Sequence, residues 1–365
     1  MIYFLINNNF HLIDAEKHLE DFKDQPTGLI KIPHKLTIIP NHPFDVEMEF
    51  PPLIKKLSDH FRLFRIFKIH QNILKQLKHV NSNDTLLFYT EYEYLSHFII
   101  SLFKKKQAKV ILIEEGFPTY LTFSSIPDKS IGIKKKILNL YLRYIIGYRN
   151  TTITSLNSTP TTIIDDKLID QLLLYNDIQI HRNVKSGLLP TKSFNYTNLE
   201  INTALFLNEG IYENYITEEN YLVIIDEILK NLSANFEKVH FKFHPRETEE
   251  AREKTKIIIK KYKNISIVLD NNPVELMIDK LGASYIFSFG SQTLLYLASS
   301  NCHPVYIFHL FPDIMKFPAF LMFKTVLESM NYQFMENWSE IKNSNNGFKI
   351  NSSINPNTLK QHIGL

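Results

Sequence analysis

Short apolar runs alternate with amphipathic segments along most of this chain, and no other feature of the sequence limits its fold so strongly. Residues Val110–Ile113 form a continuous apolar run, which is typical of a strand covered on both faces of a parallel sheet. The segment before that run, Tyr94–Lys104, has apolar residues at helical spacing and ends in lysines, where cations suit the helix dipole. A helix followed by a buried strand in this way predicts the α/β class.

The same two patterns locate the other elements and a boundary between two domains. Strands are expected at residues 2–6, 29–32, 86–89, 110–113, 151–155, 178–184, 204–207, 238–243, 265–269, 284–287 and 304–308. Helices are expected at residues 51–67, 71–79, 94–104, 129–149, 165–176, 218–232, 247–262, 294–299, 317–329 and 356–363. No clear period covers the stretch around Gly187 and Pro190. We therefore expect an N-terminal domain at 1–185, a linker at 186–202 and a C-terminal domain at 203–365, whose last helix could pack back on the N-terminal domain.

Composition excludes several classes of function. The 365 residues carry a net charge of +3, which is too close to balance to indicate nucleic-acid binding. The single cysteine, Cys302, excludes an intramolecular disulfide and a zinc cluster of thiolates. Residues 2–6 lack the basic segment that begins a signal peptide, and no apolar run approaches the ~20 residues that a membrane-spanning helix needs. A reducing, cytoplasmic location is therefore expected.

A histidine–proline pair follows the strand expected at 238–243. Pro245 cannot donate to a strand ladder, and it disfavours helical geometry at His244. The strand should therefore end with the imidazole at its carboxyl end, which is where ligands bind in open α/β sheets. The simpler interpretation is a histidine that only ends a strand, since the pairs His42-Pro43 and His303-Pro304 also occur.

Two adjacent carboxylates, Glu114 and Glu115, follow the strand expected at 110–113. Gly116 and Pro118 then indicate a turn that exposes acid groups. The pair is either a solvated acidic loop or the source of a general base, whose pKa its neighbour and partial burial would set. Because adjacent side chains of a strand point to opposite faces, only one of the two acids should face a ligand.

The strand expected at 284–287 ends in Ser288-Phe289-Gly290-Ser291-Gln292-Thr293, and a helix follows. Glycine permits a tight turn, and hydroxyls with backbone N–H groups at a helix start can bind an anion. The segment is not a P-loop, because the lysine after the glycine is missing. Alternatively, Ser291 or Thr293 is only a helix N-cap. Glu275, at another expected helix start, either accepts hydrogen bonds from ribose hydroxyls or only complements the helix dipole.

A basic amphipathic helix is expected at 129–149. Three consecutive lysines, Lys134-Lys135-Lys136, precede apolar residues at helical spacing. This helix either packs on its domain with the basic side in water, or contacts an anionic membrane surface or a charged glycan carrier.

These three motifs, in this order, resemble those of bacterial sialyltransferases of the lipooligosaccharide and capsule type. The acid-acid-glycine motif lies at 114–116, the His-Pro motif at 244–245 and the Ser/Thr-rich motif at 288–293. The resemblance covers these motifs and the general layout, and it implies a GT-B fold, in which two Rossmann-like domains face each other across a cleft. One departure is Gln292, which separates hydroxyl residues that are often paired in the family and leaves open which hydroxyl holds the phosphate.

The resemblance also implies an activity, namely inverting transfer of sialic acid from CMP-sialic acid to a sugar hydroxyl of a bacterial surface glycan, in a capsule or lipooligosaccharide. Glu114 or Glu115, with a slight preference for Glu115, would be the base for the acceptor hydroxyl. His244 would donate a proton or hydrogen bond to the departing phosphate. The implied donor-binding residues are Pro245, Glu275, Ser288, Gly290, Ser291, Gln292 and Thr293. No metal or cofactor is expected, because CMP is already a good leaving group and no Asp-x-Asp pair lies in a suitable loop.

Two other functions fit the same residues. One is a GT-B glycosyltransferase that uses a UDP-sugar or another NDP-sugar, and the other is a non-catalytic protein that binds a glycan or nucleotide. The expected partners are CMP-sialic acid and an oligosaccharide or glycolipid acceptor, without nucleic acid. If the helix at 129–149 contacts lipid, the protein would be peripheral on the inner face of the cytoplasmic membrane.

Overall fold

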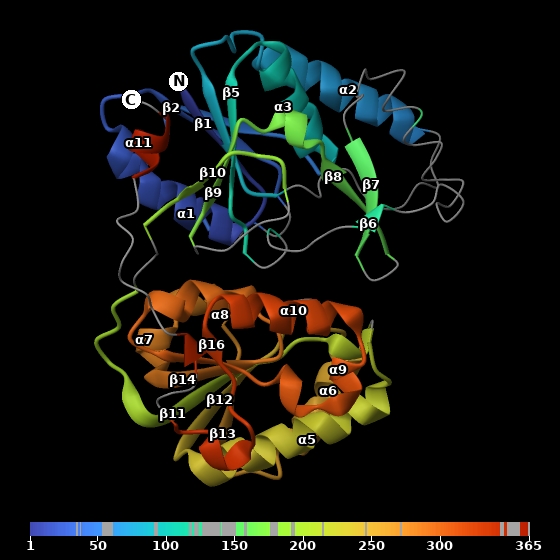
Figure 1. Ribbon diagram of the computed structural model, residues 1–365, viewed down its shortest axis with the longest axis vertical. Helices are drawn as coiled ribbons and strands as arrows, with labels where there is room; N and C mark the ends of the chain where they lie inside the picture. The colour runs from blue at the N-terminus through green and yellow to red at the C-terminus, as the bar shows by residue number, and fades with distance from the viewer. Residues whose placement is uncertain are drawn as a thin grey trace. The chain divides into compact units, whose positions relative to one another are not determined.

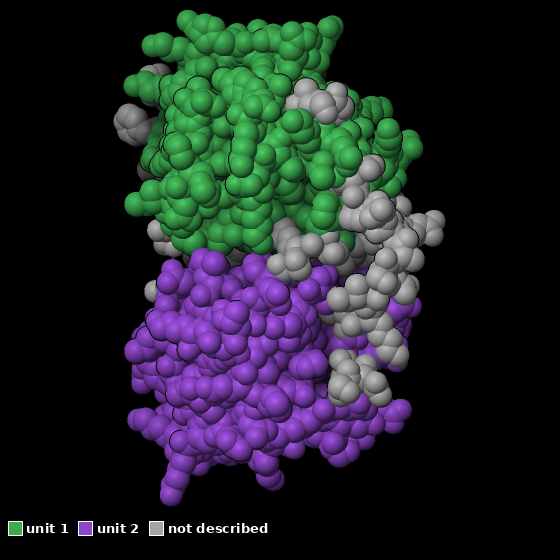
Figure 2. Space-filling model, turned by 90° about the vertical axis from the view of Figure 1, so that its left-hand side faces the viewer, with its two compact units in different colours: residues 1–115, 122–190, 355–365 green, residues 116–121, 191–354 purple. Residues whose placement is uncertain are grey.

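The chain forms two compact units, which are coloured by residue range in Figure 2. Unit 1 comprises residues 1–115, 122–190 and 355–365, and unit 2 comprises residues 116–121 and 191–354. The computed structural model describes residues 1–33, 36, 38–52, 61–90, 94–116, 119, 124–125, 140, 151–156, 159–175, 182–190, 194–213, 215–244, 247–270, 272–343, 347–348 and 358–363. The boundary between the units falls inside the acid-acid-glycine motif, after Glu115.

Unit 1 is built on a parallel sheet with the strand order β10-β9-β5-β4-β1-β2-β3. Its strands are β1 (Ile2–Ile6), β2 (Thr27–Lys31), β3 (Val46–Glu49), β4 (Thr85–Phe88), β5 (Lys109–Ile113), β9 (Gln171–Leu174) and β10 (Ser186–Leu188). The chain first runs from β1 to one edge and then returns to β4 on the other side of β1. In sheets of this kind the carboxyl ends beside such a reversal hold ligands.

Helices and a small antiparallel sheet complete unit 1. The helical segments are α1 (Asn9–Leu19), η1 (Glu20–Phe22), α2 (Phe61–Gln76), α3 (Tyr94–Lys105), η4 (Asp166–Leu168) and α11 (Leu359–Ile363), and the antiparallel strands are β6 (Ser124–Ser125), β7 (Thr151–Leu156) and β8 (Thr159–Ile164). Leu12 of α1 and Leu359 of α11 belong to one buried core with Phe4 and Ile111 of the sheet. Helix α11 therefore packs on unit 1, beside α1 in Figure 1.

Unit 2 is built on a second parallel sheet, with the order β13-β12-β11-β14-β15. Its strands are β11 (Glu200–Leu207), β12 (Lys238–Lys242), β13 (Ile265–Val268), β14 (Ala283–Ser288) and β15 (His303–Tyr306), with a short antiparallel pair of β16 (Tyr332–Gln333) and β17 (Gly347–Phe348). The strand order reverses between β11 and β14. Strand β12, which His244 follows after one residue, lies directly beside β11.

Helices cover both sides of the unit 2 sheet. They are η5 (Ile211–Glu213), α5 (Glu218–Asn235), α6 (Glu249–Ile259), η6 (Val274–Leu276), α7 (Ile278–Leu281), α8 (Gln292–Tyr296), η7 (Leu297–Ser299), η8 (Phe308–Leu310), α9 (Pro312–Met315), α10 (Pro318–Ser329) and η9 (Trp338–Glu340). Figure 1 shows α5 on the opposite side of the strands from α8 and α10. The Thr217 hydroxyl caps α5, and Glu218 and Glu219 complement its dipole. Among the residues that the structure describes, no helix has the length and apolar character needed to cross a membrane.

The α/β class predicted from the sequence is confirmed, and most strands lie where their apolar runs indicate. The helix predicted at 165–176 is wrong, because β9 occupies Gln171–Leu174 in the middle of the unit 1 sheet. A short run of leucines fits a helix or a buried strand equally well by periodicity, and here pairing with β5 decides. The ends of the predicted linker at 186–202 also belong to strands, namely β10 and β11.

Some predicted elements fall on residues that the structure does not describe. The basic helix predicted at 129–149 lies outside the described residues, apart from the helical backbone of Leu140. Residues 53–60 are also outside them, and the helices predicted at 51–67 and 71–79 correspond in the described part to the continuous helix α2. Of the strand predicted at 178–184, the described residues 182–184 form a bend.

Candidate active site

The acid pair of unit 1 directly follows β5, and the structure separates the two carboxylates. Glu114 is fully buried. Its backbone N–H donates to the Leu173 carbonyl at 2.8 Å, and its carboxylate accepts the Tyr175 backbone N–H at 2.6 Å. Both partners lie in or just after β9, the neighbouring strand. Glu114 therefore joins two strand ends inside the unit.

Glu115 keeps access to solvent, with 19% of its side chain exposed. Its Oε1 lies 3.1 Å from Nε2 of His11, whose side chain is completely buried. The two glutamates thus point in different directions, as adjacent residues at a strand end do. Of the two acids, Glu115 is the one that a substrate could reach.

His11 was not among the residues that sequence reasoning selected. It lies in the first turn of α1, directly after β1, and its ring stacks on Tyr89 with centroids 4.7 Å apart. The backbone N–H of Asn7 donates to His11 Nδ1 at 3.1 Å. The sequence does contain a feature that could have identified His11. It comes shortly after the first predicted strand, and the carboxyl ends of parallel strands, including the one before the acid pair, meet at one edge of the sheet.

A buried polar cluster lies behind these residues and fixes α1 to β9. The Tyr175 hydroxyl lies 2.9 Å from both carboxylate oxygens of Asp14, and Nε2 of His18 lies 3.1 Å from the same hydroxyl. Burial raises the pKa values of Tyr175 and Tyr89 well above their usual range, and the negative charge of Asp14 acts in the same direction. Both phenols therefore stay protonated, and the Tyr175 hydroxyl donates to Asp14.

Gly116, the third member of the acid motif, belongs to unit 2. Its φ of 121° lies in the region that L side chains rarely adopt. A Cβ atom at this position would lie 2.9 Å from the Tyr296 hydroxyl and 3.3 Å from Gln292. Both the backbone conformation and the close neighbours therefore require glycine here.

In unit 2, His244 follows β12 and its backbone is held by hydrogen bonds. Its N–H donates to the carboxylate of Glu247 at 2.7 Å, and its carbonyl accepts from the Glu247 N–H at 3.1 Å and from Arg252 at 3.2 Å. Glu247 is buried and also accepts from the Asn208 amide at 2.9 Å, at the end of β11. Pro245 lies outside the described residues. The imidazole is thus carried on a corner that is anchored to the neighbouring strand.

The Ser/Thr-rich segment begins at Ser288, the last residue of β14, and its hydroxyls differ in their surroundings. Ser288 is completely buried, and its hydroxyl donates to the Leu207 carbonyl at 3.0 Å. Ser291 lies at the N-cap position of α8 but makes no capping hydrogen bond through its side chain. Ser291, Gln292 and Thr293 are all partly exposed. Ser288 thus joins β14 to β11, whereas the later residues keep access to solvent.

Glu209 is the second functional candidate that sequence reasoning missed. It lies two residues after β11, and its carboxylate accepts the Gly290 N–H at 2.8 Å. Burial raises the pKa of the Glu209 carboxyl to about 7, although the bond from Gly290 acts in the opposite direction. Glu209 precedes Gly210 after a predicted strand, which is the same pattern that selected Glu115 and Gly116 in unit 1.

Glu275 lies in η6, where it is buried rather than at the surface of a helix start. Its backbone carbonyl accepts the Tyr196 hydroxyl at 3.1 Å. Burial lowers the pKa of Lys242, at the end of β12, while the charges of Asp270 and Glu275 act in the opposite direction. The ammonium of Lys242 also donates to the Asp270 carbonyl. The Glu275 carboxylate therefore acts electrostatically on this strand-end cation.

The strand order brings most of the predicted unit 2 residues to one edge. β12, β11 and β14 are neighbours in the sheet, so His244, Glu209 and residues 288–293 follow adjacent carboxyl ends. This edge includes the reversal between β11 and β14, where ligands bind in α/β sheets. It offers an imidazole, hydroxyls and a carboxyl that can change its charge near neutral pH. Glu114 and Glu115 belong to unit 1.

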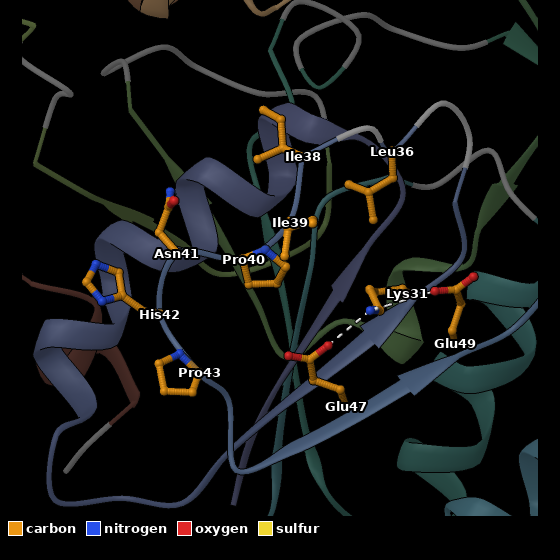
Figure 3. A pocket seen from close by; sticks show the side chains of 10 residues that line it. All are labelled: Lys31, Leu36, Ile38, Ile39, Pro40, Asn41, His42, Pro43, Glu47 and Glu49. Atoms are coloured by element: carbon orange, nitrogen blue, oxygen red, sulfur yellow. Dashed lines mark hydrogen bonds and ion pairs between the residues drawn. The ribbon is translucent and has the colours of Figure 1, made fainter.

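A cavity of ≈ 520 Å³ lies elsewhere in unit 1 (Figure 3). Lys31 of β2 projects into it and forms ion pairs with Glu47 and Glu49 of the edge strand β3, at 3.0 and 3.7 Å. The rest of its lining comes from Leu36, Ile38, Ile39, Pro40, Asn41, His42 and Pro43. Strands β4 and β1 separate β2 from β5 in the sheet order, so this cavity is distinct from the site of Glu114 and Glu115, which follow β5.

Solved structures share this fold at low sequence identity. A Listeria monocytogenes protein described as a UDP-N-acetylglucosamine 2-epimerase has a TM-score of 0.51 and 8% identity, over 84% of this chain and 78% of the other. The UDP-GlcNAc 2-epimerase of Methanocaldococcus jannaschii has a TM-score of 0.50 and 10% identity, over 96% and 95% of the two chains. The likeness confirms the predicted GT-B type of fold, with Rossmann-like α/β units.

Comparison of the sequence with curated proteins finds no match. The sequence model of one protein family, described as alpha-2,8-polysialyltransferase (POLYST), matches residues 4–305. This range includes the acid pair, the histidine–proline pair and the Ser/Thr-rich segment. Because the match covers most of both units, the chain belongs to the alpha-2,8-polysialyltransferase family and is a glycosyltransferase of the sialyltransferase type.

Proposed function

We propose that this protein is an inverting sialyltransferase, which moves sialic acid from CMP-sialic acid to a sugar hydroxyl of a bacterial capsule or lipooligosaccharide. Membership of a polysialyltransferase family supports the transfer of sialic acid. The observation that carries the proposal is the edge of unit 2, where His244 follows β12 and the partly exposed residues 291–293 follow β14, the two strands that flank β11. An imidazole and hydroxyls at such an edge suit an anionic phosphate ester.

In the proposed reaction, the acceptor hydroxyl oxygen forms a bond to the anomeric carbon of sialic acid. The bond from that carbon to the phosphate oxygen of CMP breaks at the same time. Glu115 takes the hydroxyl proton as general base, and His244 as imidazolium gives a proton or hydrogen bond to the departing phosphate. A single displacement from the opposite face inverts the configuration of the carbon. Glu115 belongs to unit 1 and His244 to unit 2.

The donor would be bound mainly through the partly exposed residues at the start of α8. Ser291, Gln292 and Thr293 are the side chains that we expect to contact the phosphate. Ser288 and Gly290 are expected to support this loop, because the Ser288 hydroxyl and the Gly290 amide already donate within the protein.

Glu275 is the candidate for the ribose hydroxyls, since its charge already acts on Lys242 at the neighbouring strand end. Pro245 would disfavour helical geometry at His244. The departing CMP is a good leaving group, so the proposed reaction proceeds without a metal ion. Transfer should therefore continue in the presence of a chelator such as EDTA, and a complete loss that Mg²⁺ restores would contradict this part of the proposal.

The direct test is incubation with CMP-sialic acid and a panel of acceptors, followed by mass spectrometry. The panel should include galactosides and glycans that end in sialic acid, because the matched family is described as forming alpha-2,8 linkages. The expected result is an acceptor that gains one or more sialic acid residues while CMP is released. If CMP-sialic acid stays intact and a UDP-sugar is consumed, the protein is instead a GT-B enzyme that uses an NDP-sugar. If neither donor reacts although a nucleotide binds, the protein is a binding protein.

A further inference from the structure

We propose that His11 is a positioning residue for this reaction, and that it holds the Glu115 carboxylate in the orientation in which Glu115 accepts the proton of the acceptor hydroxyl. This inference rests on the proposed function. None of the three predicted motifs includes His11, which lies 104 residues before Glu115 in the chain.

The hydrogen bonds around the imidazole determine which of its nitrogens carries the proton. The Asn7 backbone N–H can only donate, and it lies 3.1 Å from Nδ1, so Nδ1 must offer its lone pair. The proton of the neutral ring is therefore on Nε2, which lies 3.1 Å from Oε1 of Glu115. The side-chain amide nitrogen of Asn8 also lies 3.1 Å from Nε2. It cannot accept the Nε2 proton, because an amide nitrogen only donates, and the oxygen of the same amide accepts the His11 backbone N–H instead. The Glu115 carboxylate is thus the acceptor for the Nε2 proton.

The surroundings of the ring allow it little freedom. The His11 side chain is completely buried and stacks on Tyr89 with an interplanar angle of 11°. Its backbone is fixed in the first turn of α1, because Asn8 caps that helix through the His11 N–H at 3.0 Å. Helix α1 follows β1 after a two-residue turn, so the strand, the cap and the ring form one rigid support. A rigid donor of this kind restricts the rotamers of a partly exposed glutamate.

The same geometry excludes His11 as the base itself. The Nδ1 lone pair accepts the Asn7 N–H, and Nε2 already carries a proton, so the neutral ring has no further site for a substrate proton. A carboxylate can accept additional hydrogen bonds while one of its oxygens is held. The proton of the acceptor hydroxyl therefore passes to Glu115, and His11 acts only through that residue.

The kinetic test compares His11→Gln, which keeps an amide donor near the position of Nε2, with His11→Leu, which fills the volume without a donor. His11→Leu should lower kcat by about ten- to a hundredfold, because small displacements of a reacting group have effects of this size. The KM for CMP-sialic acid should change little, and His11→Gln should restore most of kcat. Equal losses for both variants would overturn the inference.

A second arm repeats His11→Leu in a Glu115→Gln background. If His11 acts through Glu115, the leucine should have no further effect on the residual rate. A loss as large as in the wild-type background would show that His11 supports the fold or another step, and would overturn the inference. His79→Ala, at an exposed position of unit 1 beyond the end of α2, is the matched control and should leave both rates unchanged.

A third arm does not depend on transfer activity or on the folding of a leucine variant. Nitrogen NMR of the folded wild-type protein, assigned by difference with His11→Gln, should show the neutral ring with its proton on Nε2. The Nε2 proton resonance should move when Glu115 is changed to glutamine, because a charged acceptor forms the stronger hydrogen bond. A proton on Nδ1, or a resonance that Glu115→Gln leaves in place, would overturn the inference. If these signatures are present but no acceptor is sialylated, the proposed function fails while the His11–Glu115 contact stands.

Discussion

The carboxylate of Glu209 accepts the backbone N–H of Gly290 at 2.8 Å, inside the loop that the sequence predicts to bind phosphate. An amide that such a loop could offer to an anion is therefore held by an acid of the protein itself. The Glu209 carboxyl can change its charge near neutral pH, because burial raises its pKa to about 7 from an ordinary value of 4.5.

Stability should therefore fall between about pH 4.5 and about pH 7. In this window the folded protein keeps a proton on Glu209 that the unfolded chain has lost, so the free energy of unfolding decreases by at most about 3 kcal/mol as pH rises. Below the window both states are protonated, and above it both are ionised. Glu209→Gln should abolish this part of the slope in denaturant titrations. Glu219→Gln, at an exposed position, should leave it unchanged. A Glu209→Gln protein with the wild-type slope would contradict the assignment.

Replacing Glu114 should lower stability, whereas replacing Glu115 should lower the rate of transfer. Glu114→Ala leaves the buried Tyr175 N–H without its acceptor and should lower the free energy of unfolding by about 1–3 kcal/mol. Glu115→Gln should leave stability nearly unchanged and lower the rate of transfer by about a hundredfold or more. Denaturant unfolding and initial rates, measured on both variants, test the pair. The prediction fails if Glu115→Gln transfers sialic acid at the wild-type rate.

How much of this site could be predicted from the sequence depends on which contacts are local. His244, Glu115 and Ser291 were found because an apolar run followed by glycine or proline marks a strand end within a few residues. Glu209 and Gly290 are 81 residues apart, and their contact exists because β11 and β14 pair side by side. Strand order of this kind is not encoded in any short segment, so partners across neighbouring strand ends were missed.

The wrong assignment of Gln171–Leu174 has the same physical origin. Its leucines have no strong preference between a helix and a buried strand, and pairing with β5 and β10 decides. The burial of Ser288 could not be predicted either, because the carbonyl that accepts its hydroxyl belongs to β11, 81 residues away. Local pattern thus located the strand ends, and pairing between strands determined which side chains remain accessible there.

Replacing Ser288 and replacing Ser291 should have different effects, one on stability and the other on ligand binding, as for the two acids. Ser288→Ala removes the bond to the Leu207 carbonyl and should cost about 1 kcal/mol of stability, with little effect on the affinity for CMP. Ser291→Ala should weaken CMP binding by several-fold while the free energy of unfolding stays the same. Calorimetric titration with CMP and denaturant unfolding provide the two readouts. The opposite pattern would place the phosphate at Ser288.

Replacement of His244 by alanine should lower the rate of transfer by roughly two to four decades, the usual contribution of a general acid. In the proposed mechanism the rate also falls at alkaline pH, as the imidazolium loses its proton. Because Glu209 also titrates near neutral pH, the profile should be recorded in a Glu209→Gln background. A rate that stays flat from neutral to about pH 9 in that background would argue against an imidazolium at this position.

Gly116→Ala should destabilise the protein by two separable effects. The methyl group would lie 2.9 Å from the Tyr296 hydroxyl, and alanine would have to adopt the φ of 121°. The backbone effect alone should cost about 1–3 kcal/mol. Tyr296→Phe removes the hydroxyl but leaves the backbone unchanged, so the double variant should recover only part of the lost stability. Denaturant unfolding of the four proteins of this cycle measures both parts. If the double variant is as stable as Tyr296→Phe alone, the positive φ carries no cost, and glycine is needed at this position only for lack of space.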